Sequence, residues 1–286
     1  ILKLQEQDLL NVNDPLSKYL ADYPEGNDIT LHHVLTHSAG IPSFTGFADY
    51  PVFKKQPITP EEIVNRFKDL PLEFEPSSSY SYSNSGYILL AHLIEKVSGK
   101  TYGEFLEGEF FGPLGLSDTG EERLETVLPH KASGYAYTGE YWNGDFVDMS
   151  VPIGAGNLYS TVQNLHQWMS SLRQGRVLET TLFGTMKSSL VGVDKDNEVF
   201  YGYGLVSVVR EDEQCYGHNG GIEGFVSEAW YYPKADLTVI VLCNVETCDT
   251  STISNALKDI CFGREVKLPE KLVAIDVDPV VLSGYV

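Results

Sequence analysis

The sequence predicts an α/β protein in which a mainly helical region joins an antiparallel sheet that is flanked by helices. Three observations support this fold class. Residues 25–190 contain most of the helix start signals and apolar stripes of the chain. Short strand-like segments with tight turns follow after about residue 196, which favours antiparallel pairing. The segment 251–263 then has the pattern of a helix that covers such a sheet.

The clearest helix start lies at Thr59. Thr59 is the expected N-cap, Pro60 occupies the first helical position and Glu62 completes a capping box. An apolar stripe of helical period follows, formed by Ile63, Val64, Phe67 and Leu70. The other helices that we expect cover residues 1–10, 28–40, 86–99, 101–111 and 160–175, the last with Ser160 as N-cap, Gln163 at N3 and Gly175 at its end.

Four segments in the last third of the chain are rich in β-branched and aromatic residues. We expect strands at residues 199–209, 213–220, 224–233 and 237–245. Earlier in the chain, aromatic residues alternate around Asn143-Gly144, a dipeptide typical of a type I′ hairpin turn. The division that follows from these elements is a helical subdomain at 25–190 and a sheet with its covering helix at 191–262.

Composition excludes several classes of partner. The 286 residues include 40 acidic and 20 basic side chains, a net charge of −20. Such a chain repels nucleic-acid phosphates and anionic lipid surfaces, so we expect neither as a partner. No apolar run approaches the roughly 20 residues that span a bilayer. Compartment and oligomeric state do not follow from these numbers.

Cysteine spacing gives no metal site. Cys215, Cys243, Cys248 and Cys261 form no CxxC pair, and we expect buried thiols, with a Cys248–Cys261 disulfide as the alternative. The sequence also lacks the G-x-S-x-G elbow and a complete P-loop.

Two histidines have the spacing of zinc ligands. His33 and His37 lie four residues apart, but Val34 stands where a zinc peptidase needs glutamate. We therefore expect structural or capping histidines, and no metal or other cofactor.

Two short segments are candidates for a functional site. Tyr82-Ser83-Asn84 precedes the apolar run 86–99, and His218-Asn219-Gly220-Gly221 ends a predicted strand. Glycines at such a position allow a ligand to approach the backbone and leave an N–H group free to donate. Each segment alone is also compatible with an ordinary loop or turn.

Together and in this order, these segments resemble the class C β-lactamase and penicillin-binding-protein superfamily of serine hydrolases. Five segments carry the resemblance, namely 1–20, "ITLHHVLTHSAGIPSF", "YSYSNSGYILLAHLIEKVSG", "GAGNLYSTVQNLHQWM" and "GHNGGIEGF". The resemblance covers nearly the whole chain. It implies the serine β-lactamase fold over residues 1–262, with the active-site cleft between the sheet and the helical subdomain.

The resemblance also implies a mechanism. A serine in an S-x-x-K motif forms an acyl-enzyme, and the lysine shares the task of general base with a tyrosine, here Tyr82. Asn84 would hold the substrate amide and the lysine. His218 would lie on the opposite wall of the cleft and contact Tyr82 or a substrate carboxylate. Asn219, Gly220 and Gly221 would line the cleft, with the Gly221 N–H as half of the oxyanion hole.

The chain departs from the family pattern in one respect. None of its lysines has a serine three residues earlier, so S-x-x-K is absent. The first residues continue a helix without an N-cap, and both ends look cut, so we expect an internal piece of a longer polypeptide. Residues 263–286 are expected to be a linker and the start of a C-terminal domain. A piece that ends within its sheet would associate through an exposed strand edge.

The resulting prediction is a serine hydrolase that acts on the amide or ester of a small molecule or short peptide, with this chain inactive by itself. His218 in place of the family's strand lysine favours a peptidase or esterase over a dedicated β-lactamase. The alternative is a non-catalytic protein that binds peptides or cell-wall fragments. Family resemblance alone favours an extracytoplasmic location.

Overall fold

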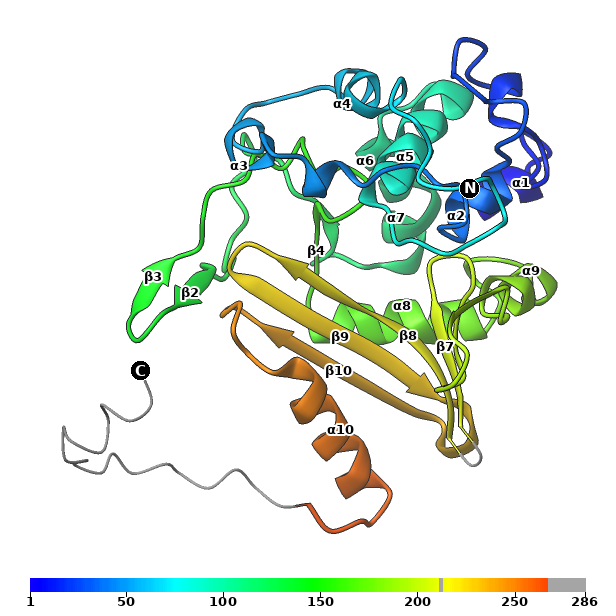
Figure 1. Cartoon of the computed structure of the whole chain (residues 1–286). Coiled ribbons are helices and arrows are strands. Elements are labelled where there is room, and N and C mark those ends of the chain that lie inside the picture. The colour runs from blue at the N-terminus through cyan, green and yellow to red at the C-terminus, as the bar shows by residue number, and fades with distance from the viewer. Residues whose placement is uncertain (211–212, 267–286) are drawn as a thin grey trace, which may run out of the picture.

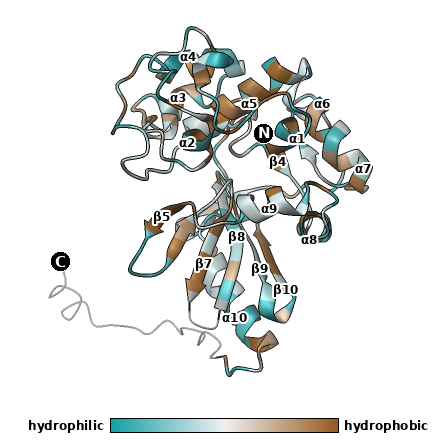
Figure 2. Cartoon of the chain, turned by 90° about the vertical axis from the view of Figure 1, so that its right-hand side faces the viewer, coloured by the Kyte–Doolittle hydropathy of each residue, from teal (hydrophilic) through white to brown (hydrophobic). Residues whose placement is uncertain are grey.

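A long buried helix, α5 (Asn84–Ser98), organises the helical part of the chain. The computed structural model describes residues 1–210 and 213–266. Ile88, Leu89 and Leu93 of α5 have no exposed surface, which explains the nearly unbroken apolar run in this helix. Figure 2 shows these brown, hydrophobic turns of α5 among the neighbouring helices. The neighbours of α5 are α2 (Leu31–Leu35), α4 (Pro60–Phe67) and α6 (Tyr102–Leu106). The helical part also contains α1 (Leu2–Glu6), α3 (Tyr50–Phe53) and α7 (Gly112–Leu114).

The helix signals that depend on local chemistry are confirmed. At the start of α4, Thr59 accepts a hydrogen bond from the Glu62 amide at 3.3 Å and Glu62 accepts one from the Thr59 amide at 2.8 Å. Gly99 ends α5 with a left-handed φ of 70°, a conformation that glycine adopts without strain.

The helix expected at residues 1–10 is shorter, since α1 ends at Glu6 and Asp8 takes a left-handed φ of 56°. Three further helix boundaries differ from the prediction. α2 ends at Leu35 rather than near residue 40, because His37 takes a left-handed φ of 55° that no α-helix can continue. The helix expected to stop before Gly112 continues through a π turn, η3 (Glu107–Phe111), into α7. Pro113 lies just after this π turn, in the first turn of α7.

The third boundary is the start of α8 (Val162–Arg173). Its N-cap is Thr161, which accepts from the Asn164 amide at 3.2 Å, so Asn164 rather than Gln163 occupies N3. The predicted cap, Ser160, bonds instead to the Thr119 hydroxyl at 2.7 Å. A further helix, α9 (Thr180–Met186), was not expected.

The predicted antiparallel sheet is confirmed. Six strands lie in the order β10-β9-β8-β7-β6-β5, and all neighbours are antiparallel (Figure 1). They are β5 (Val191–Asp194), β6 (Val199–Tyr201), β7 (Val206–Arg210), β8 (Glu213–Ile222), β9 (Phe225–Tyr232) and β10 (Leu237–Cys243). A small ladder joins β1 (Gly120–Glu121) to β4 (Leu158–Tyr159).

The single strand predicted at 199–209 is two strands, β6 and β7. The chain turns between them at Gly202 and Gly204, of which Gly204 has a φ of 76°. A Cβ on Gly202 would lie 2.2 Å from the Met186 carbonyl oxygen, so this turn passes directly against α9. Close packing therefore decides where the strand breaks.

The hairpin β2 (Tyr135–Tyr137) and β3 (Tyr141–Asn143) exists, but its turn was placed wrongly. The chain reverses at residues 138–140, where Gly139 has a φ of 101°, and not at Asn143-Gly144. Gly144 packs on the turn between β8 and β9 instead, since a Cβ there would lie 3.0 Å from the Gly224 Cα. The glycine serves a close approach rather than a turn.

Two helices cover opposite faces of the sheet. Tyr216 and Tyr231 point to the face covered by α8, where the Arg173 guanidinium lies 3.8 Å from the Tyr231 ring centre. Cys215 and Tyr232, one position away, point to the face of α10 (Thr250–Cys261), as the two-residue strand period requires.

All four cysteines are thiols rather than half-cystines. Only Cys215 is buried, and Cys261 is exposed, so the expected burial is wrong for Cys261. Most of the C-terminal segment predicted at 263–286 lies outside the described residues. The division of the chain at residue 190 stays a prediction.

Truncation of the α5 core is expected to be costly. Leu93→Ala should lower the free energy of unfolding by about 3 kcal/mol, because it removes buried methyl groups and leaves a cavity in a fully enclosed position. Urea denaturation measures the change, with Val127→Ala as control because Val127 is 89% exposed. Equal midpoints for the two variants would contradict this placement of α5.

Candidate active site

The predicted site residues meet at one cavity of about 460 Å³ between the start of α5 and the end of β8. Tyr82 and Asn84 form one side, and residues 218–221 form the other. The structure thus brings together all six residues that the sequence singled out. The cavity is lined by Tyr82, Asn84, Tyr87, Ala155, Tyr201, Gly204, His218, Asn219, Gly220 and Gly221.

Backbone hydrogen bonds hold the Tyr82–Asn84 segment in place. The Ser83 amide donates to Nδ1 of His37 at 3.0 Å, and the Asn84 amide donates to the Ser43 hydroxyl at 3.2 Å. The Asn84 carboxamide also reaches Thr45 Oγ1 at 3.4 Å. All three partners come from the chain after α2, so this loop fixes the entrance of α5.

The other wall is the end of β8, where one strand edge has no neighbour among the described residues. The partners of β8 on β7 stop at Gly217, whereas those on β9 continue to Ile222. Ile222 and Phe225 flank a two-residue turn, and residues that flank such a turn are hydrogen-bonded to each other. The N–H of Ile222 therefore points to β9, and successive N–H groups of a strand point alternately to its two edges. The N–H groups of Asn219 and Gly221 therefore point to the free edge, at the cavity.

The two glycines have different surroundings. A Cβ on Gly220 would lie 2.7 Å from the Ser227 hydroxyl, so packing with β9 favours glycine there. At Gly221 the nearest atom would be 4.0 Å away, on Val226. The backbone of Gly221 is therefore not crowded on the side where a Cβ would stand, and Gly221 lines the cavity.

Tyr201 is a site residue that sequence reasoning missed. It is 1% exposed, and its hydroxyl lies 3.0 Å from Nε2 of His218. Nδ1 of His218 lies 2.5 Å from the Asn219 carbonyl oxygen, which can only accept, so Nδ1 carries the proton and Nε2 accepts from Tyr201. Nothing in the segment "VFYGYG" distinguished Tyr201 from an ordinary core tyrosine.

His37 is the second missed residue. His37 is 2% exposed, and its ring packs against four tyrosines, with ring centres 4.1 Å from Tyr82, 4.9 Å from Tyr87, 4.7 Å from Tyr201 and 6.1 Å from Tyr80. Burial, with a smaller contribution from His218, lowers the pKa of His37 to about 3. His37 is therefore neutral and serves as a hydrogen-bond acceptor.

The structural role expected for these histidines is confirmed. His33 completes a capping box with Thr30, whose amide donates to His33 Nδ1 at 3.2 Å. Within residues 1–210 and 213–266, no group of three histidine, cysteine or acidic side chains could hold a metal ion.

The cavity is electrically neutral at pH 7. Burial raises the pKa of Tyr82 and lowers the pKa of His218, so both groups favour their uncharged forms. No lysine, arginine or carboxylate lines this cavity. The residues can therefore donate and accept hydrogen bonds, but none of them is an ionised base.

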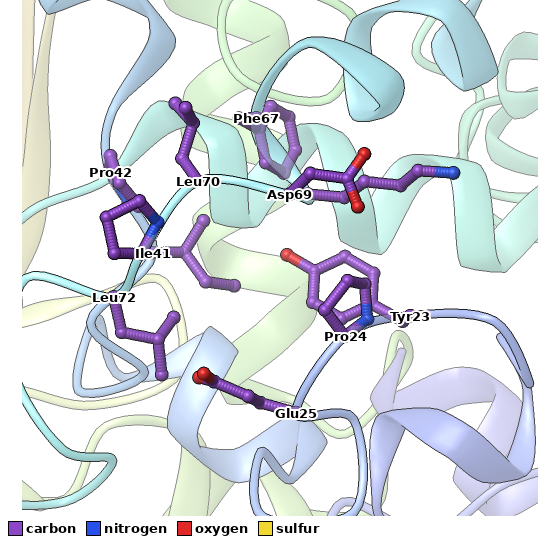
Figure 3. Close-up of a pocket in the computed structure, with 11 residues that line it drawn as sticks. Tyr23, Pro24, Glu25, Ile41, Pro42, Phe67, Asp69, Leu70 and Leu72 are labelled. Carbon is purple, nitrogen blue, oxygen red and sulfur yellow. The ribbon is translucent and has the colours of Figure 1, made fainter.

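A second cavity, of about 330 Å³, lies elsewhere, between the chain around Tyr23 and the segment after α4. Figure 3 shows Ile41, Phe67 and Leu72 in its wall, with the carboxylates of Glu25 and Asp69 beside them. None of the predicted site residues lines it. The chemistry of the site therefore belongs to the first cavity.

Comparison with known proteins agrees with this geometry. The family model described as Beta-lactamase matches residues 1–258. This chain belongs to the Beta-lactamase family. The fold class predicted from the sequence is thereby confirmed.

Relatives in this family include a penicillin-binding protein of Bacillus subtilis strain 168, 28% identical over 95% of this chain and 64% of its own length. The teichoic acid D-alanine hydrolase of Staphylococcus aureus is 24% identical over 90% of this chain and 62% of its own length. This chain therefore spans less than two thirds of these curated relatives.

A solved structure has the same fold. The octameric penicillin-binding protein homologue of Pyrococcus abyssi superimposes with a TM-score of 0.80 and is 28% identical, over 92% of this chain and 63% of that chain. Among the described residues, no helix is long and apolar enough to cross a membrane.

The buried neutral state of His37 predicts a pH dependence of stability. The pKa is about 3 in the folded protein and about 6.5 in the unfolded chain, so between these values the unfolded state binds more protons and stability falls as pH is lowered. His37→Asn keeps an acceptor for the Ser83 amide and tolerates positive φ, but cannot titrate. The wild type should therefore lose about 2 kcal/mol more than this variant between pH 7.5 and pH 5.

Urea denaturation at both pH values gives the free energy of unfolding of each protein, and hence the loss between them. His130→Asn is the matched control, because His130 also has a positive φ, 60°, but is exposed. If His37→Asn and the wild type lose equal stability, His37 is not held neutral by its surroundings.

Proposed function

We propose that the cavity between Tyr82 and Gly221 is the acyl-binding site of a serine hydrolase that acts on a small amide or ester. The observation that carries this proposal is the meeting of the Tyr82–Asn84 segment with the free edge of β8. There a substrate carbonyl oxygen can accept from the Gly221 amide while its own amide contacts Asn84. Membership of the Beta-lactamase family supports the same reaction class.

The nucleophile is not among the residues of the cavity. No serine and no lysine line it, and none of the lysines of the chain follows a serine at the S-x-x-K spacing. A phenol whose pKa is raised by burial removes a proton at neutral pH only beside a cation. We therefore propose that hydrolysis requires an S-x-x-K segment in addition to these 286 residues, with its lysine beside Tyr82.

The substrate class rests on the relatives. One of them is named as a teichoic acid D-alanine hydrolase, which acts on a D-alanyl group. His218 holds a neutral tautomer against Tyr201 and so offers no positive charge to a substrate carboxylate. This favours an ester or amide of a D-amino acid over a substrate bound mainly through its carboxylate.

Intact mass after exposure to a fluorophosphonate tests the proposal, because an activated serine displaces fluoride and retains the phosphonyl group. Protein expressed from the complete reading frame should gain one adduct, and the 286-residue chain should gain none. Failure of both to react, together with saturable binding of a D-alanyl peptide, would support the alternative of a non-catalytic binding protein. The lack of serine and lysine in the cavity is what favours that alternative.

Tyr82→Phe tests the base. In the protein that forms the adduct, this variant should react roughly 100-fold more slowly, because it keeps the ring packed on His37 and removes only the hydroxyl. Tyr80→Phe is the matched control, since Tyr80 also packs on His37, with ring centres 6.1 Å apart, but does not line the cavity. Equal rates for the two variants would exclude Tyr82 as the base.

A further inference from the structure

The hairpin β2–β3 carries a cluster of tyrosine rings. In Figure 1 this hairpin extends away from the sheet and the helices. Cross-strand partners Tyr135↔Asn143 and Tyr137↔Tyr141 share one face, because directly opposed residues of a ladder point the same way. The ring centres of Tyr137 and Tyr141 are 5.0 Å apart, and those of Tyr135 and Tyr141 are 6.4 Å apart. We call these four side chains the tyrosine face.

The tyrosine face is open to solvent. Tyr141 is 68% exposed and Tyr137 is 44% exposed, although rings of this size normally contribute to a core. Exposed aromatic groups that touch one another mark binding surfaces more often than isolated ones do. No aliphatic side chain belongs to this face, and Asn143 adds an amide beside the rings. Its partner must therefore combine apolar surface with many hydroxyl or amide groups.

We infer that the tyrosine face binds the sugar rings of a neutral oligosaccharide. One side of a pyranose ring presents C–H groups that pack on an aromatic ring, while its rim carries hydroxyl groups. Phenol and carboxamide groups both donate and accept hydrogen bonds, and so match that rim. Stacked tyrosines with an adjacent asparagine supply both kinds of contact.

Charge excludes the alternatives of an anionic lipid surface or an acidic polymer. Glu140 lies exposed in the turn of the hairpin. The nearby lysines are neutralised, since Lys55 pairs with Asp145 at 2.6 Å and Lys54 pairs with Glu223 at 2.5 Å. The whole chain carries a net charge of −20. An uncharged ligand meets no repulsion at this face, whereas an anionic one does.

The hairpin is anchored next to the candidate active site. The Tyr135 amide donates to the carbonyl oxygens of Gly224, at 3.3 Å, and Asn244, at 3.0 Å. Gly224 belongs to the turn that directly follows the cavity strand, and the buried Lys54 pairs with Glu223 in the same turn. A saccharide on the tyrosine face is therefore held at a fixed position relative to residues 218–221. This inference does not depend on the nucleophile, and so stands apart from the proposed hydrolysis.

Calorimetric titration of the 286-residue chain with chitotetraose and cellotetraose tests the inference. Each ring contact is modest, so we expect a Kd of about 1 mM for at least one of the two. Tyr137→Ala with Tyr141→Ala should weaken binding about tenfold or more. The corresponding double phenylalanine variant should lose less, about threefold to fivefold, because the rings remain and only the hydroxyl contacts are lost. If the double alanine variant does not fold, Tyr141→Ala alone replaces it and should also weaken binding.

Trp142→Ala is the matched control. Trp142 is 56% exposed on the same hairpin but pairs with Ala136 and points to the opposite face, so its loss should change the Kd by less than about twofold. Three outcomes would overturn the inference: no heat with either sugar at about 10 mM, an equal loss in Trp142→Ala, or loss of binding in the phenylalanine variant. Binding to phosphatidylglycerol vesicles in place of the sugars would assign the face to a membrane and overturn it as well.

Discussion

The amide of Ser83 donates a hydrogen bond to Nδ1 of His37, and the geometry of the candidate site depends on this bond. It ties the entrance of α5 to the end of the α2 loop, where His37 has a left-handed backbone. The bond requires a neutral imidazole with its proton on Nε2, and the same burial that encloses the ring lowers its pKa and preserves that form. Tyr82 and Asn84 owe their positions to this arrangement.

The His37 ring also connects the helical part of the chain to the sheet. Tyr201 of β6 packs on His37 and reaches His218 of β8, so a continuous line of contacts runs from α5 to the cavity edge of the sheet. These contacts are ring packing and neutral hydrogen bonds rather than ion pairs. The contacts that hold the site together therefore avoid the cost of burying unpaired charges.

A neutral cavity has a chemical consequence. The N–H groups at the free edge of β8 can stabilise an oxyanion without a nearby charged group. A phenol, in contrast, acts as a base at neutral pH only beside a cation. Under the proposed function, the described part of the chain provides the binding and stabilising half of the acyl-transfer site. The ion pairs of Lys54 lie at the turn beyond the cavity strand, where they fix the backbone and contribute no charge to the cavity.

Residue patterns alone determined the fold class, the capping of α4 at Thr59, the end of α5 at Gly99 and the two motifs of the site. Each depends on local chemistry or on a short motif within a few residues, so the sequence displays it directly. Patterns failed wherever a distant contact competes with a local preference. Ser160 is not the N-cap of α8, because its hydroxyl is hydrogen-bonded to that of Thr119. Gly144 is not part of a turn, because it packs closely against Gly224.

Only the tertiary structure shows that His37 and Tyr201 belong to the site. His37 precedes Tyr82 by 45 positions and Tyr201 follows it by 119. His37 stands in the segment "ITLHHVLTHSAGIPSF", which carries the family resemblance without assigning this residue to the site, and Tyr201 stands in none of the five segments. Their roles arise because folding encloses both rings between α5 and the sheet, where burial fixes the protonation of the histidine and the hydroxyl of the tyrosine finds His218. Burial and long-range contacts are properties of the assembled chain, which the order of its residues does not display.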